Sequence, residues 1–270
     1  MRLLVLCFFL VALFFSRVLA GEVRLQGNQT QGGLVFGMTE PGSRVELNGQ
    51  ALALSVNGHF LIGFGRNAKK EATLKTIGLD GKVNTHILKV KPRVYETQRI
   101  NGLPSRIVIP KPKDVIRIRA ENAEIGRVRA LDTHRAYFLS GFVWPVTGPI
   151  SGVFGSQRIL NGKPRNPHNG TDIAAIEGTI IRAPADGVVA LVHEDMFYTG
   201  KTLMLDHGFG LTSVYAHMSA SLVNEGDLVK QGAPIGKVGK TGRATGAHLH
   251  WGITLKHIHL DPALIAGEMN

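Results

Sequence analysis

The stretch Thr245–Ile253, TGAHLHWGI, decides the fold of the C-terminal half of the chain, because apolar residues alternate there with two histidines. In a β-strand, residues two positions apart face the same side. His248 and His250 therefore share one face, while Leu249 and Trp251 point into the opposite layer. The pattern predicts a strand whose apolar face is buried and whose polar face carries two imidazoles. These imidazoles could bind a metal ion or simply be solvated, and the stretch alone does not distinguish the two.

The surrounding residues 141–270 have the composition of an all-β unit. Glycine-rich turns alternate with runs rich in valine and isoleucine, as in GTIIRAPADGVVALV (178–192) and GDLVKQGAPIGKVGKTG (226–242). No long helical periodicity is present, and the runs are short and closely spaced, which favours a compact antiparallel sheet. Eight of the eleven histidines of the chain fall in this unit.

Residues 21–91 predict a second, smaller β-rich domain. Short β-type runs are separated there by the dipeptides Asn48-Gly49, Asn57-Gly58 and Asp80-Gly81. Such dipeptides supply the positive φ angles that tight hairpins need. We expect a small antiparallel sandwich, and no cluster of catalytic residue types occurs in it.

Residues 92–140 predict a connector between the two units. Its first part is rich in proline and reads as extended chain. The following segment, DVIRIRAENAEIGRVRALDTHRAYF (114–138), can form a helix capped by Asp114, with its charges on a solvated face, although Gly126 argues against a helix. The fold class is therefore all-β, with a C-terminal antiparallel sheet domain, an N-terminal sandwich-like domain and a connector that can contain a helix.

Residues 1–20 have the features of a secretory signal peptide: Arg2, an apolar run from Leu3 to Phe15, and small residues ending at Ala20. A membrane anchor is the alternative, but the apolar run is shorter than the roughly 20 residues that span a bilayer. Cys7, the only cysteine, lies in this segment, so the mature protein would contain no disulfide. We expect export to the periplasm, with secretion as the alternative.

The chain is basic, with a net charge of +11 that becomes +9 when Arg2 and Arg17 leave with the signal peptide. A basic exported protein is attracted to anionic surfaces such as cell-wall polymer or membrane headgroups. Scattered lysines that only keep the protein soluble explain the charge equally well. We expect no nucleic-acid partner, because no recognition motif occurs and the compartment is wrong.

Two further segments place histidines near other polar residues. NPHNGTDIAA (166–175) holds His168 and Asp172 around an Asn-Gly turn that can bring an imidazole and a carboxylate together. TSVYAHMS (212–219) places His217 at the end of a strand-like run. Two histidines and one carboxylate, with the fourth position open, form a common catalytic zinc site.

The order of these motifs resembles the lysostaphin/LytM-type zinc metalloendopeptidases, from about Trp144 to Pro262. The resemblance rests on H-x-x-x-D at 168–172, YAHM at 215–218 and the H-x-H pair that follows GKVGKTGRATGA (236–247). The region from Gly21 to about Ala136 lies outside it.

The resemblance implies one Zn²⁺ per chain, bound by His168, Asp172 and His250. It also implies that His217 and His248 flank the bound water and the scissile peptide without binding the metal. No H-E-x-x-H motif occurs, so a histidine has to act as the base, and which of the two does so stays open. A second H-x-H pair, His257 and His259, is expected to be structural or on the surface. Arg158 and Asn166 are candidates for the border of the substrate groove.

The function expected from these residues is a zinc-dependent endopeptidase that hydrolyses peptide bonds of peptidoglycan, in its cross-links or stem peptides. The alternative is a catalytically silent module of the same fold that binds the cell wall or regulates another hydrolase, and the chain then has a regulatory protein partner. A periplasmic zinc carrier is a third hypothesis, which histidine tracts without a glycine-rich strand framework would fit better. The sequence does not assign a role to the N-terminal unit.

Overall fold

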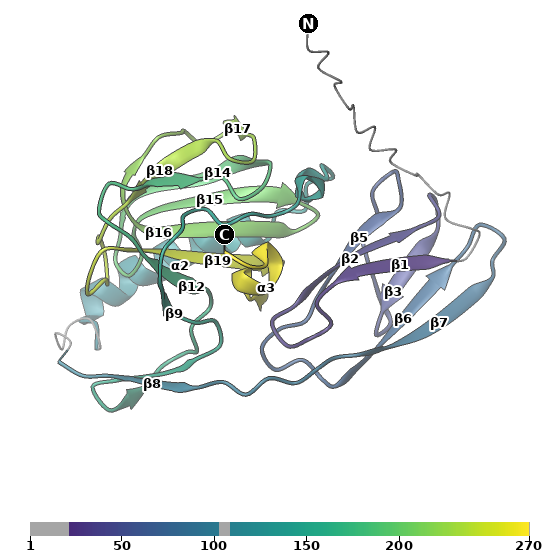
Figure 1. The fold of residues 1–270 in the computed structure, drawn as a ribbon, viewed down its shortest axis with the longest axis horizontal. Coiled ribbons are helices and arrows are strands. Elements are labelled where there is room, and N and C mark those ends of the chain that lie inside the picture. Colours follow the sequence, from purple (N-terminus) through teal and green to yellow (C-terminus); the bar gives the residue numbers. More distant parts are fainter. Residues whose placement is uncertain (1–21, 103–108, 270) are drawn as a thin grey trace, which may run out of the picture.

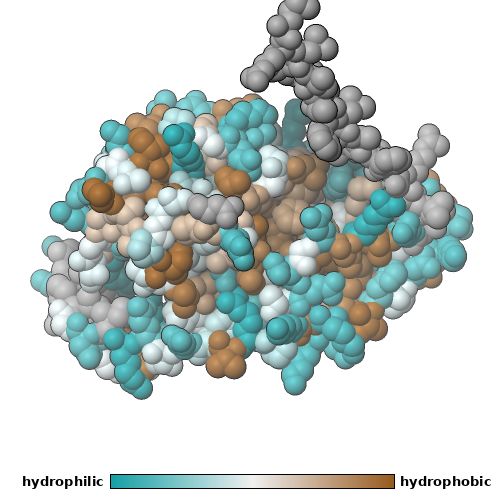
Figure 2. Space-filling view, in the orientation of Figure 1, coloured by the Kyte–Doolittle hydropathy of each residue, from teal (hydrophilic) through white to brown (hydrophobic). Residues whose placement is uncertain are grey.

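The computed structural model describes residues 22–102 and 109–269 (Figure 1). The predicted signal peptide, residues 1–20, and Cys7 lie outside the described residues. Among the helices within those ranges, none has the length and apolar character needed to cross a bilayer. Figure 2 shows polar and apolar side chains interspersed over the visible face of both lobes.

The N-terminal unit contains two antiparallel sheets packed face to face. One sheet has the order β1 (Val23–Gly27), β2 (Leu34–Thr39), β5 (His59–Gly63), and the other has the order β4 (Gln50–Ala51), β3 (Arg44–Leu47), β6 (Glu71–Ile77), β7 (Val83–Lys89). Val35, Phe60 and Leu74 are fully buried between them. The expected Asn-Gly and Asp-Gly turns are present, with glycine φ angles near +80° at Gly49 and Gly58.

The connector contains a short strand and a long helix. Strand β8 (Thr97–Ile100) pairs in parallel with β10 (Gln157–Leu160), which in turn pairs with β11 (Lys163–Pro164). Helix α2 extends over Pro112–Arg129 and is followed by a single 3-10 turn at Tyr137–Ser140.

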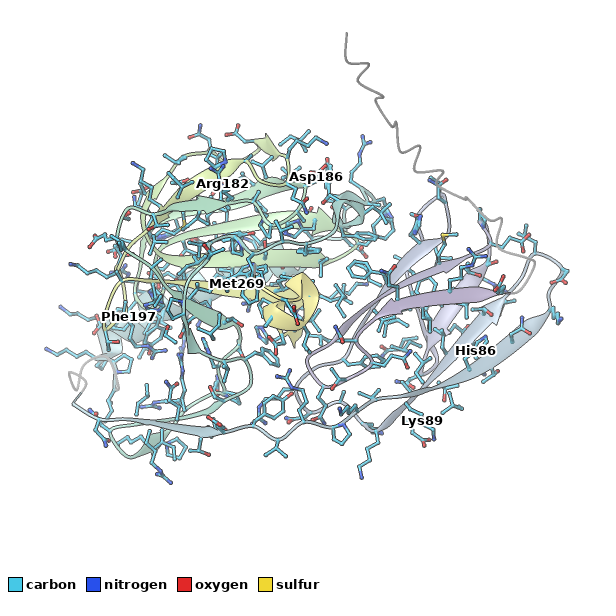
Figure 3. The ribbon with its side chains drawn as sticks, in the orientation of Figure 1. His86, Lys89, Arg182, Asp186, Phe197 and Met269 are labelled. Carbon is cyan, nitrogen blue, oxygen red and sulfur yellow. The ribbon has the colours of Figure 1, made fainter. Side chains whose placement is uncertain are left out.

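Helix α2 differs from the sequence expectation at its start and on its charged face. The N-cap is Lys111 and not Asp114, whose carboxylate instead sits at the third helical position and accepts from the Lys111 amide. Pro112 explains the earlier start, because its fixed φ suits the first helical position. The charged face is not wholly solvated, since Glu121 is buried and accepts hydrogen bonds from Arg117 and from the amide of Phe197. Figure 3 labels Phe197 next to the helix.

The C-terminal unit is a ten-stranded antiparallel sheet with the main order β17-β14-β15-β16-β19-β12-β9, and β13, β18 and β20 pair beside this path. Its strands are β9 (Ile150–Gly152), β12 (Thr171–Ala174), β13 (Ile180–Arg182), β14 (Gly187–Met196), β15 (Gly200–Gly208), β16 (Leu211–Ser221), β17 (Leu228–Val229), β18 (Pro234–Val238), β19 (His248–Leu255) and β20 (Ile258–Leu260). A short helix, α3 (Pro262–Ala266), follows the last strand.

The alternation predicted for β19 is present. Leu249, Trp251 and Ile253 have no exposed surface and belong to the main core. His248 and His250 lie on the other face, where each keeps part of its surface exposed. The all-β class predicted from the sequence is confirmed, because antiparallel strands form most of both units.

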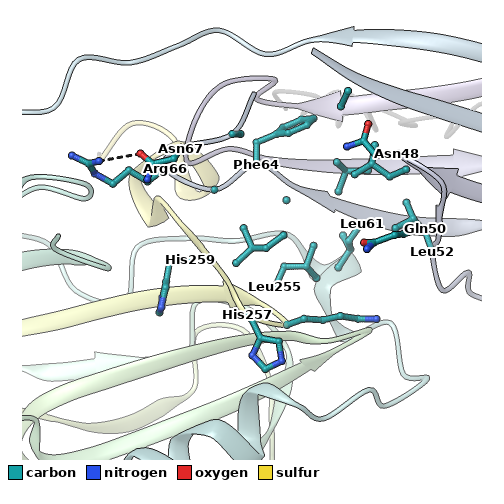
Figure 4. A pocket seen from close by; sticks show the side chains of 18 of the residues that line it. Asn48, Gln50, Leu52, Leu61, Phe64, Arg66, Asn67, Leu255, His257 and His259 are labelled. Atoms are coloured by element: carbon teal, nitrogen blue, oxygen red, sulfur yellow. Dashed lines mark hydrogen bonds between the residues drawn. The ribbon is translucent and has the colours of Figure 1, made fainter. Parts of the chain in front are cut away.

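The two units pack directly against each other. Leu34 and Leu61 of the N-terminal unit belong to the main core of the C-terminal sheet, and Arg93 forms an ion pair with Asp261 at 2.7 Å. A cavity of about 860 Å³ lies between the units, and Figure 4 shows His257 and His259 beside it. This second H-x-H pair therefore lies in the β19–β20 hairpin and at the contact between the units.

Candidate metal centre

Two adjacent strands and one loop bring the predicted ligands together. Asp172 on β12 is directly opposite His250 on the antiparallel neighbour β19. His168 lies in the loop that precedes β12; this loop bends at Gly170 but does not form the tight turn expected from Asn169-Gly170, because neither residue has a positive φ. A side chain at Gly170 would place its Cβ atom about 3.0 Å from Nε2 of His250, so glycine allows the loop to approach this imidazole closely.

Three ligand atoms converge in this structure. Oδ1 of Asp172 lies 2.7 Å from Nδ1 of His250 and 3.0 Å from Nε2 of His168, and the two ring nitrogens are 3.0 Å apart. Separations of this size allow one ion to contact all three atoms at the usual zinc distances of about 2.0–2.2 Å. Among the residues that the structure describes, His168, Asp172 and His250 form the one group of possible metal ligands whose ligand atoms lie this close together.

Hydrogen bonds leave the converging nitrogen of His168 free to bind a metal. Nδ1 of His168 donates to the carbonyl oxygen of Val153 at 3.1 Å, so Nε2 carries the lone pair. The His168 side chain is almost completely buried, and burial is the main cause that lowers its pKa. A neutral imidazole with a fixed tautomer is the form that coordinates a divalent ion.

Arg158 holds the carboxylate of Asp172 in place from the other side. Its Nη2 atom donates to Oδ2 of Asp172 at 3.0 Å, which leaves Oδ1 toward the two imidazoles. Burial acts to raise the pKa of Asp172, but its interactions with the imidazoles of His168 and His250 outweigh burial and hold the pKa well below its usual range. Asp172 is therefore an anion at neutral pH. Arg158 and Asn166 were predicted at the border of the substrate groove. Arg158 lines the pocket that also contains His217 and His248, whereas Asn166 does not.

His217 and His248 stand side by side next to the three converging residues. Their ring centres are 4.7 Å apart, and those of His217 and His250 are 6.2 Å apart. Nδ1 of His217 donates to the carbonyl oxygen of Thr241 at 2.8 Å, and Nδ1 of His248 donates to that of Gly246 at 2.9 Å. Each imidazole therefore keeps Nε2 without a proton and available as an acceptor.

The sequence predicts that His217 ends a strand, and the structure shows that it does not. Strand β16 continues to Ser221, and His217 lies inside it with a left-handed backbone, φ +63°. The pairing registers of β16 with β15 and β18 both shift close to this residue, which is the mark of a β-bulge. Left-handed backbone at a non-glycine residue costs free energy, and such strain concentrates at functional sites.

Burial first, and then the nearby imidazoles of His250 and His248, lower the pKa of His217 to about 3. His217 is therefore neutral at pH 7. A pocket of about 160 Å³ opens beside it, with Asp172, His248 and His250 also in its walls.

Five pocket residues were not identified from the sequence: Gln98 of β8, Ser151, Leu160, Arg243 and Thr245. Thr245 and Arg243 lie within the glycine-rich loop GKVGKTGRATGA, where an arginine among small residues was the available signal. Gln98 comes from the connector, and no local pattern predicts that a strand so distant in sequence from the other pocket residues reaches the site.

The converging residues suit a metal ion by their chemistry. Two imidazole nitrogens and a carboxylate oxygen, all with lone pairs, face one another at 2.7–3.0 Å, an arrangement that a cation between them would stabilise. The resulting set of two histidines and one aspartate leaves a coordination position for a water or a substrate.

Comparison with known proteins agrees with this site. Residues 166–262 match Peptidase family M23. This part of the chain is an M23 peptidase domain. All five predicted site residues fall within the matched M23 region.

Several curated proteins are similar to the M23 domain. The peptidoglycan DD-endopeptidase ShyA of Vibrio cholerae is 40% identical over 90 residues, which are 33% of this chain and 21% of that protein. The DD-carboxypeptidase/endopeptidase Mpg of Neisseria meningitidis is 41% identical over 99 residues, 37% of this chain and 23% of that protein. The chain thus spans only about a fifth of the length of these relatives.

The N-terminal unit has a structural counterpart as well. A crystal structure of a candidate M23 peptidase from Pseudomonas aeruginosa aligns with 90% of this chain and 96% of its own, with a TM-score of 0.67 and 28% sequence identity. The likeness therefore extends beyond the M23 domain into the sandwich and the connector.

Proposed function

We propose that the protein is a zinc-dependent endopeptidase that hydrolyses peptide bonds of peptidoglycan after export to the periplasm. The single observation that carries this proposal is the convergence of His168, Asp172 and His250 on one point, with the imidazoles of His217 and His248 beside it. The M23 match and the similar DD-endopeptidases support the substrate class.

In this proposal His168, Asp172 and His250 hold one Zn²⁺ per chain. Bound zinc supplies Lewis acidity, which polarises the scissile carbonyl group and lowers the pKa of water to about 7. Arg158 keeps Asp172 oriented, and the Val153 carbonyl keeps His168 in the correct tautomer.

His217 and His248 perform the proton transfers. Each presents an unprotonated Nε2 beside the pocket, and each tautomer is fixed by a backbone carbonyl. One of the two accepts the proton of the attacking water, and the other hydrogen-bonds the developing oxyanion or passes a proton to the leaving amine.

The test is digestion of purified peptidoglycan by the mature protein, with the products identified by mass spectrometry and the metal content measured in the same sample. We expect one zinc per chain and soluble peptide fragments that show a newly cut peptide bond. Protein that contains zinc and releases nothing from any wall preparation would support the silent-module alternative instead.

A further inference from the structure

Arg243 is held rigidly in the wall of the catalytic pocket. Its backbone amide donates to the carbonyl oxygen of Tyr198 at 2.7 Å, and its guanidinium lies 4.4 Å from the centre of the Tyr198 ring. Both the backbone and the side chain of Arg243 are therefore fixed by one residue. Arg243 lines the same 160 Å³ pocket as His217 and His248. A guanidinium held in this way loses little conformational entropy when it binds a ligand.

The positive charge of Arg243 has no counter-ion within residues 22–102 and 109–269, where no ion pair to it occurs. The other arginine of the pocket, Arg158, is already paired with Asp172. Burial lowers the pKa of Arg243, and the charges of Arg158 and Arg165 lower it further while Tyr198 opposes this. A guanidinium nevertheless stays charged at neutral pH. A partly buried cation among other cations is stabilised by an anionic ligand.

We propose that Arg243 determines substrate specificity by binding a free carboxylate next to the scissile peptide bond. A guanidinium and a carboxylate form paired, charge-assisted hydrogen bonds. The pocket, of about 160 Å³, has room for a carboxylate beside the scissile peptide unit. This inference rests on the proposed function.

The first experiment compares two peptides that differ only in whether the carboxylate next to the scissile bond is free or is a carboxamide. We expect the zinc-loaded wild type to cleave the acid with a kcat/KM about 10- to 100-fold higher, the range for one charge-assisted interaction. Arg243→Gln removes this preference by slowing cleavage of the acid. The control is Arg99→Gln, which removes the same charge from an exposed residue beside Gln98 and leaves the preference intact.

The second experiment measures binding of both peptides to metal-free protein by calorimetry, so that zinc cannot attract the carboxylate. The acid should bind about tenfold more tightly than the amide to the wild type and equally to Arg243→Gln. If Arg243→Gln does not fold, Arg243→Lys replaces it, because lysine keeps the charge but cannot form the paired hydrogen bonds.

Equal treatment of the two peptides by the wild type, or an unchanged preference in the Arg243 variant, would overturn the inference. Cleavage of both peptides at equal rates would leave the proposed function standing while removing the carboxylate site. A preference in binding without any cleavage would show the opposite: the carboxylate site would stand, and the proposed function would fail.

Discussion

The Nδ1 atom of His217 donates a hydrogen bond to the carbonyl oxygen of Thr241 at 2.8 Å, which ties a residue inside β16 to the loop that leads into β19. The hydroxyl of Thr241 donates to the carbonyl oxygen of Met218 and accepts from the amide of Lys201. One threonine therefore fixes the loop on two strands and the tautomer of His217. The orientation of His217 is built into the sheet and does not depend on a bound metal.

This arrangement predicts that the histidines divide into two groups by their effect on zinc. His217→Ala and His248→Ala should retain zinc but lower kcat by about 10²- to 10⁴-fold, because general acid and base catalysis contributes about that much. His168→Ala and His250→Ala should lose zinc, because each removes a ligand. Zinc content and hydrolysis are measured on the same samples.

The control for these variants is His257→Ala, which removes an exposed histidine of the β19–β20 hairpin and should change neither zinc content nor rate. Loss of zinc from the His248 variant would show that His248 is a ligand and would contradict the division of roles.

The backbone of β9 lies so close to Asp172 that it restricts the metal site. A Cβ atom added at Gly152 would lie 2.4 Å from Oδ2 of Asp172 and 2.9 Å from its Cγ. We predict that Gly152→Ala displaces the carboxylate and weakens zinc binding by about 10- to 100-fold, as measured by competition with a chelator.

Gly126→Ala is the matched control, because nothing lies within 4 Å of the added Cβ atom and the residue is inside helix α2. It should raise the free energy of unfolding by about 1 kcal/mol without changing zinc affinity. Equal zinc affinity in the Gly152 variant would mean that Asp172 is not confined by β9.

The strand pattern was predictable from the sequence because it depends on local alternation. Leu249 and Trp251 alternate with His248 and His250, and a strand with period two has only one way to bury the apolar set. This alternation alone indicates which face of β19 carries the imidazoles. The tight turn predicted at Asn169-Gly170 is not formed, since the loop only bends at Gly170.

Other features depend on tertiary contacts that no short pattern contains. The left-handed backbone of His217 follows from a bulge between three strands, and the role of Glu121 follows from a hydrogen bond to a residue 76 positions away. Gln98 reaches the pocket only because β8 pairs with β10. The start of α2 at Pro112 was missed for a different reason: Asp114 suits either the cap or the third helical position, and only the backbone distinguishes them.

His207 makes the stability of the protein sensitive to acid. It is fully buried; its Nδ1 donates a hydrogen bond to the Asp186 carbonyl oxygen, and its Nε2 accepts one from the Ser213 hydroxyl. Burial lowers its pKa from 6.5 to about 4. The unfolded chain therefore binds a proton more readily, and the stability that neutral His207 contributes is present above pH 6.5 and lost as the pH falls toward 4.

We predict that the urea midpoint of the metal-free protein falls between pH 7 and pH 5 and that His207→Gln shows a smaller fall, although it is less stable at pH 7. Chelator is present throughout, so that release of zinc does not contribute. An identical fall in both proteins would assign the acid sensitivity to other groups.

The ion pair between Arg93 and Asp261 should be a main connection between the two units. Arg93 comes from the connector, and Asp261 is a buried side chain, 5% exposed, that also accepts from the Ala263 amide as the N-cap of α3. Removing one partner of a buried pair leaves an uncompensated charge, which costs about 3 kcal/mol. Arg93→Met should lower the free energy of unfolding by about this amount.

Lys89→Met is the control, because its pair with Glu71 is exposed on both sides and should contribute less than about 1 kcal/mol. Denaturant unfolding of both variants measures the difference, and equal losses would show that the contact between the units contributes no more than a surface pair.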